Sequence, residues 1–198
     1  MQLKFLFLIF FSLQLFATDK IIIREDWAET PPELPVTQKH VTNDKLTLQL
    51  HGDSKDKIKK SHHKKIKNDP FYIWSGRTRS VWAVSLKLKE EVAVAGKNLT
   101  VKWRTKQYKR TLQLIVQNEE GKWFIYKDGT GESKDWLESR IKIDATNWHE
   151  FDIDKLSMGK AVDKLELKSL KAFGFTDLTA GGDSKACSRL DWIELIFD

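Results

Sequence analysis

The stretch Val101-Lys-Trp-Arg-Thr105 carries the pattern from which the fold follows. Apolar and charged side chains alternate in it, and a period of two places one kind on each face of an extended strand. Turn-forming residues separate similar runs elsewhere, so the sequence predicts an antiparallel β-sandwich or barrel, with residues 155–163 able to hold one helical turn. The other alternating runs are 46–50, 112–116, 141–144, 151–154, 165–167, 173–175 and 190–192.

Three segments follow one another in the order of a known fold. The strand at 101–105 is followed by Thr111-Leu-Gln-Leu-Ile-Val-Gln117, and Trp148-His-Glu-Phe-Asp-Ile153 then places a tryptophan before an alternating strand. The last is Ser188-Arg-Leu-Asp-Trp-Ile-Glu-Leu-Ile196. Over roughly residues 95–198 they resemble galactose-binding-like β-jelly-roll domains, the fold of many carbohydrate-binding modules. The resemblance implies an all-β jelly-roll sandwich whose last strand lies beside its first, and carbohydrate binding as the function.

Three further motifs are similar to those of an exported bacterial family of uncharacterised activity. They are KKSHH at 59–63, FYIWSG at 71–76, and GFTDL at 174–178 together with CSRLDWIEL at 187–195. This second resemblance implies export and no particular reaction.

The N-terminal residues predict export as well. Lys4 precedes an apolar run from 5 to 16, which is too short to span a bilayer and is typical of a secretory signal peptide over residues 1–17. An uncleaved anchor is the alternative. We therefore expect a periplasmic or extracellular protein without stable membrane insertion after signal removal. Its single cysteine, Cys187, forms no internal disulfide and is expected to be a small buried residue near the start of a strand.

The rest of the chain, in a protein of 198 residues, suits one domain. Residues 18–40 hold three of the four prolines and predict an extended lead-in that lies against the domain, with Trp27 as its anchor. Residues 41–198 are then the β-sandwich domain.

A basic stretch followed by aromatic residues is the strongest candidate site. Seven lysines fall between Lys55 and Lys67, and Phe71-Tyr-Ile-Trp74 alternates, so that one pair of side chains can face the core and the other a ligand. Lysines attract carboxylate or sulfate groups, and rings stack on sugars. We expect an anionic polysaccharide as the partner, with burial of all four side chains as the alternative. The candidate contacts are Lys59, Lys60, His62, His63, Lys64, Tyr72, Trp74 and Arg77.

Catalysis is a competing hypothesis for the same stretch. A polysaccharide lyase or hydrolase could use His62, His63, Lys60 or Tyr72 for acid, base or charge-neutralising roles. Adjacent histidines among lysines are poorly arranged to bind zinc. Export disfavours nucleic acid as the partner, and a structural or partner-binding envelope protein remains a further alternative.

No cofactor is expected from the sequence, apart from a weak indication of structural Ca²⁺. The glycine-rich connector between 176 and 191 contains Asp177, Asp183 and Asp191, and carboxylates with backbone carbonyls are ligands that Ca²⁺ prefers.

Overall fold

The computed structural model describes residues 19–180 and 186–198. The predicted signal peptide at 1–17 and Asp183 lie outside these residues. Both helices in the described part have three residues, so neither could cross a membrane. The elements are β1 Lys20–Glu25, η1 Gln38–His40, β2 Leu46–His51, η2 Lys55–Lys57, β3 Lys59–Ser61, β4 Tyr72–Trp74, β5 Trp82–Ala93, β6 Leu99–Tyr108, β7 Gln113–Asn118, β8 Trp123–Tyr126, β9 Leu137–Lys142, β10 Trp148–Asp152, β11 Ser157–Val162, β12 Ser169–Asp177 and β13 Cys187–Phe197.

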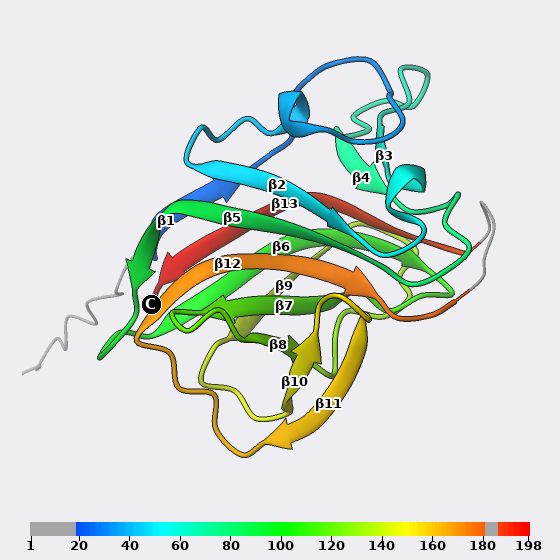
Figure 1. Ribbon diagram of the computed structural model, residues 1–198. Coiled ribbons are helices and arrows are strands. Elements are labelled where there is room, and N and C mark those ends of the chain that lie inside the picture. The colour runs from blue at the N-terminus through cyan, green and yellow to red at the C-terminus, as the bar shows by residue number, and fades with distance from the viewer. Residues whose placement is uncertain (1–18, 181–185) are drawn as a thin grey trace, which may run out of the picture.

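Within the described residues these strands form two antiparallel sheets that pack as the layers of a sandwich (Figure 1). Sheet A has the order β3-β4-β13-β6-β9, and β1 also pairs with β13. Sheet B has the order β11-β10-β8-β7-β12-β5-β2. The predicted all-β jelly-roll sandwich is confirmed, and its last strand lies beside its first, as the resemblance implied.

Aromatic packing between the two sheets supplies much of the core. Trp27, Trp82, Trp103 and Trp148 are all buried. Phe175 meets the rings of Trp27 and Trp82 edge-on, with centroids 6.4 and 6.0 Å apart. Large rings bury much apolar area, which stabilises the sandwich. Cys187 is buried at the start of β13, as expected.

The lead-in packs on the domain and contributes a strand to it. Residues 20–25 pair with β13 as β1, and Trp27 is the buried anchor that was expected. The buried carboxylate of Glu25 accepts hydrogen bonds from the backbone N–H groups of Trp27, Thr42 and Asn43 at 2.8–3.0 Å. These bonds tie the lead-in to the start of the predicted domain.

Two predictions about local structure were wrong. Residues 165–167 are not a strand but part of the loop between β11 and β12, where Leu165 and Leu167 are buried in the core while Glu166 stays exposed. Their alternation reflects the burial of a loop. Residues 155–163 form no helical turn, because they pass from a tight turn into β11.

A second apolar cluster lies on the outer face of sheet B. Ile115 and Ile125 belong to it, although their strand neighbours point into the main core. The turn between β10 and β11 brings Leu156 over this face, where a Cβ placed on Gly52 would come within 2.5 Å of its Cδ1. Part of the outer face of sheet B is therefore closed by apolar packing.

Candidate functional site

Four side chains from four strands form one row on the outer face of sheet A. The register places Lys59 of β3 opposite Trp74 of β4, and Trp74 opposite Arg189 of β13. Arg189 in turn lies opposite Lys106 of β6. Neighbouring strands are about 4.8 Å apart, so the row is about 14 Å long. These four residues are called the cross-strand row below.

The row faces outward because the residues next to it face inward. Ile73, Leu190 and Thr105 are adjacent to row residues in their strands, and all three are buried. Successive side chains on a strand point to opposite faces. All four side chains of the row are consequently half-buried, with part of each reaching solvent.

The cations of the row differ from their neighbours in lacking carboxylate partners. Nη1 of Arg104 lies 2.6 Å from Oδ2 of Asp191, and Nζ of Lys102 lies 3.1 Å from Oε2 of Glu138. For the three cations of the row, no ion pair within 4.0 Å occurs in residues 19–180 and 186–198. Their charges are therefore available to an anionic ligand, whereas those of the neighbouring pairs are already compensated.

A cavity of about 550 Å³ opens at the end of the row. Lys106 and Arg189 line it together with Lys134, and Glu132 is the one carboxylate that lines it within the described residues. Tyr108 also lines it, with 41% of its surface exposed. Three cations facing one carboxylate favour an anion, and the exposed ring offers an apolar surface beside them.

The ring of Trp74 lies close to the backbone of Gly76. A Cβ built on Gly76 would lie 2.0 Å from Cζ2 of Trp74, so only glycine permits this approach. Nζ of Lys59 lies 5.7 Å from the centroid of the same ring. Trp74 thus presents an aromatic surface between two cations, Lys59 and Arg189.

The two predicted histidines lie beside the same carboxylate, that of Asp69, but contact different rings. His62 stacks on Phe71, with ring centroids 4.2 Å apart and 23° between the planes. His63 is exposed, and its Nδ1 lies 2.9 Å from the Tyr72 hydroxyl and 3.2 Å from Oδ2 of Asp69. Nδ1 of His62 lies 4.0 Å from the same Asp69 oxygen, so the two imidazoles meet at this carboxylate.

Two predicted contact residues are buried, which corrects the expectation that they meet a ligand. Tyr72 shares a face with Trp74, as the alternation predicted, but it is only 2% exposed and packs edge-on against Trp136, with centroids 5.4 Å apart. Burial raises the pKa of its hydroxyl. Lys60 is 0% exposed, because it pairs with the core residue Ile73 and lies under the lead-in at Glu33.

The remaining predicted contacts reach solvent. Lys64 lies in the loop between β3 and β4, and Arg77 follows β4; both are exposed. Together with Lys59 and Trp74 they retain the basic and aromatic character that the sequence predicted for this end of sheet A.

Asp177 and Asp191, the two calcium candidates within the described residues, interact with other partners. Oδ2 of Asp191 forms the ion pair with Arg104, and Oδ2 of Asp177 lies 3.7 Å from Nε of Arg110. Asp177 also accepts hydrogen bonds from the Thr179 N–H and the Ser188 hydroxyl. Burial raises the pKa of both carboxyls. No cluster of three acidic, histidine or cysteine side chains suited to a metal occurs in the part of the chain described.

Sequence reasoning did not include Lys106, Tyr108, Lys134 or Arg189 in the site. The alternation of Lys102, Arg104 and Lys106 on the solvent face of β6 was a usable signal. Which of these cations meets Trp74 depends on how β4, β13 and β6 pair, and the sequence does not contain that register.

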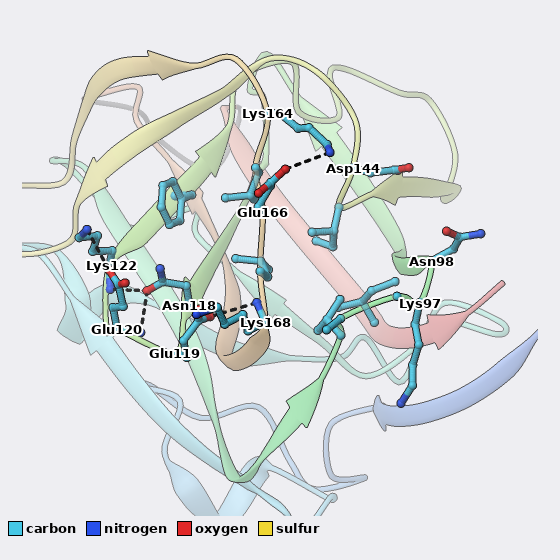
Figure 2. Close-up of a pocket in the computed structure, with 18 residues that line it drawn as sticks. Lys97, Asn98, Asn118, Glu119, Glu120, Lys122, Asp144, Lys164, Glu166 and Lys168 are labelled. Atoms are coloured by element: carbon cyan, nitrogen blue, oxygen red, sulfur yellow. Dashed lines mark hydrogen bonds and ion pairs between the residues drawn. The ribbon is translucent and has the colours of Figure 1, made fainter.

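A larger cavity, of about 600 Å³, lies between loops at the ends of the strands (Figure 2). Four acidic and four lysine side chains line it, and two ion pairs, Lys164–Glu166 at 3.0 Å and Lys122–Glu120 at 2.9 Å, form among them. Because its charges balance, it attracts an anionic polymer less than the cavity beside the cross-strand row does.

The chain matches no family model and none of the curated proteins. Among solved structures it is similar to a family 11 carbohydrate-binding module of a Clostridium thermocellum cellulosomal cellulase, with 14% identity, a TM-score of 0.48, and 92% of this chain and 96% of that one covered. A family 29 carbohydrate-binding module with cellulohexaose is similar at 12% identity and a TM-score of 0.49, covering 83% and 89%. An exo-β-agarase matches with a TM-score of 0.51 and 9% identity, over 79% of this chain and 23% of the agarase. The likeness to the agarase, whose TM-score exceeds 0.5, shows the fold alone.

Proposed function

We propose that this protein is exported and binds an anionic polysaccharide, without cleaving it, at the cross-strand row and the adjoining cavity. The observation that carries the proposal is the row itself. Its three cations have no carboxylate partner within 4.0 Å in the described residues, and two of them, Lys59 and Arg189, lie on either side of Trp74.

The geometry suits a chain of charged sugars. Lys59, Arg189 and Lys106 would neutralise carboxylate or sulfate groups, since lysine acts as a point charge and arginine can form two parallel hydrogen bonds to one such group. Trp74 and Tyr108 would contact the apolar faces of the sugar rings. A surface about 14 Å long takes several sugar units, so a polymer is favoured over a single sugar.

Two observations support binding rather than cleavage. A β-elimination needs a base and a neutralising cation open to the substrate. Tyr72 is buried and the pKa of its hydroxyl is raised, while Lys60 of β3 is buried beneath the lead-in, so neither side chain is open to a substrate at the cross-strand row. His63 is exposed and is the catalytic candidate that a test must include.

Affinity electrophoresis in gels containing uronate, sulfated or neutral polysaccharides tests the proposal. Gels with an anionic polymer should retard the protein, and the double variant Lys106→Gln/Arg189→Gln should lose most of that retardation. Lys102→Gln is the matched control, because Lys102 lies on the same strand and face but is paired with Glu138. Equal losses in the two variants, or equal retardation by neutral polymers, would contradict the proposal.

The same samples test the enzyme alternative. We expect no rise in the absorbance of unsaturated uronates and no new reducing ends. If product did form, and was lost in His63→Ala, the protein would be a polysaccharide lyase or hydrolase. An absence of both retardation and product across the panel would favour the structural or partner-binding alternative.

A further inference from the structure

The loop between β3 and β4 carries an exposed isoleucine at its tip. Ile66 is 55% exposed, in a segment where every residue from 63 to 68 is exposed. In Figure 1 this loop lies at the periphery of the molecule, beyond the ends of β3 and β4. A single exposed apolar residue is common on protein surfaces, so the surroundings of Ile66 decide whether it has a role.

Hydrogen bonds within the loop form a defined turn that holds its tip in the solvent. The N–H of Ile66 donates to the carbonyl of His63 at 2.9 Å, and the N–H of Asp69 donates to the carbonyl of Ile66 at 3.2 Å. The Asp69 carboxylate accepts a hydrogen bond from the His63 N–H at 2.7 Å. At its base, His62 is stacked on Phe71. Ile66 is therefore held away from the core.

Positive charge surrounds the isoleucine. Lys64, Lys65 and Lys67 are exposed, and none has an ion pair within 4.0 Å in the described residues. Asp69 is the nearest acid in sequence, and its carboxylate is engaged by His63. The tip thus combines one apolar side chain with three uncompensated lysines.

We propose that this loop docks on the surface of a bilayer that contains anionic phospholipids. Lysines near such a surface are attracted by its negative potential, and an apolar side chain gains free energy by entering the boundary between headgroups and acyl chains. An anionic polysaccharide would use the lysines but would leave the isoleucine in water. The bilayer is therefore the partner that fits both features, and this inference does not rest on the proposed function.

Co-sedimentation of the full chain with lipid vesicles tests the proposal. Vesicles with about three parts in ten phosphatidylglycerol should bind the wild type at about 0.1 M salt, and pure phosphatidylcholine vesicles should bind it far less. Ile66→Ser should weaken binding about fivefold, because burial of the isoleucine is lost. Lys64→Gln/Lys65→Gln/Lys67→Gln should abolish the preference for the anionic lipid.

Ile21→Ser is the matched control, since Ile21 on β1 is also 55% exposed and lies outside the basic loop. It should bind vesicles as the wild type does. All chains carry the same N-terminal segment, so that segment contributes equally to each. Equal effects of the two serine variants, or no effect of either, would overturn the proposal. Polysaccharide retardation should be unchanged in Ile66→Ser, and its loss would assign the loop to the polysaccharide site instead.

Discussion

Lys60 is a cation enclosed by the protein. Its Nζ donates to the carbonyl oxygen of Thr30 and lies 4.2 Å from the centroid of the Phe71 ring. Burial lowers its pKa to about 8, while the nearby carboxylate of Glu29 acts in the opposite direction. The pKa of His40 is lowered as well, mainly by burial and in smaller part by the positive charge of Lys60. The hydrogen bond from Lys60 to Thr30 helps to hold the lead-in against β3, although burial makes the charged form of this lysine unfavourable.

This cost predicts a specific pH dependence of stability. Between about pH 8 and pH 10.5 the unfolded chain holds a proton on Lys60 that the folded protein has released, so the free energy of unfolding rises with pH in that window. In Lys60→Met this contribution is absent. Urea denaturation of both proteins at several pH values should show that the free energy of unfolding of the wild type rises relative to that of the variant across this window, by at most about 3 kcal/mol. A difference that stays constant from pH 7 to pH 11 would contradict the assignment.

At the scale of the elements, alternation located strands where one face is buried and the other wet. It found β6 because Trp103 is buried between solvent-facing Lys102 and Arg104, and it found β2 in the same way. It did not distinguish the loop at 165–167, because a loop that lies on the core alternates as a strand does. Strands as short as β3 offer too few residues to show a period.

Only part of the candidate site was predicted, because local sequence patterns do not show which strands pair. Trp74 follows from the alternation of residues 71–74 and Lys59 from the run of lysines between 55 and 67, and both are local patterns in the sequence. Arg189 joins them only through the pairing of β4 with β13, more than a hundred residues apart in sequence. Lys60 and Tyr72 were assigned to the ligand because the sequence does not show that the lead-in covers one of them and Trp136 the other.

Gly76 gives a prediction about how the turn after β4 serves the site. A methyl group there would meet the indole of Trp74 at 2.0 Å, so Gly76→Ala should displace the ring outward and weaken polysaccharide binding about tenfold. Because Trp74 is only half-buried, the loss of stability should stay below about 1 kcal/mol. Affinity electrophoresis would measure the loss of binding, and near-ultraviolet circular dichroism would report the displacement of the indole ring.

Gly131→Ala is the matched control for this variant, because a Cβ at Gly131 has no atom within 4 Å. It should leave both the affinity and the aromatic signal unchanged. If Gly76→Ala retained full affinity while its dichroism changed, the orientation of Trp74 would not matter for binding.

At the scale of the whole molecule, the two sheets differ in what they offer to a partner. Part of the outer face of sheet B is filled by the apolar cluster under the β10–β11 turn. The outer face of sheet A carries cations, most of them paired with carboxylates away from the cross-strand row. A formal net charge of +6 therefore acts as a diffuse field, whereas the row supplies specific local contacts.

These two contributions predict how salt changes binding. Screening shortens the reach of exposed charges from about 10 Å at 0.1 M salt to about 3 Å at 1 M, so retardation by an anionic polysaccharide should weaken steeply as salt is raised. Lys106→Gln/Arg189→Gln should show a much shallower dependence, since it lacks two of the contacts being screened. Lys102→Gln removes one positive charge from the same face and should keep the steep dependence of the wild type, because its charge is already compensated by Glu138. If the slope instead followed net charge alone, the control would fall midway between the wild type and the double variant, and the diffuse field rather than the cross-strand row would account for binding.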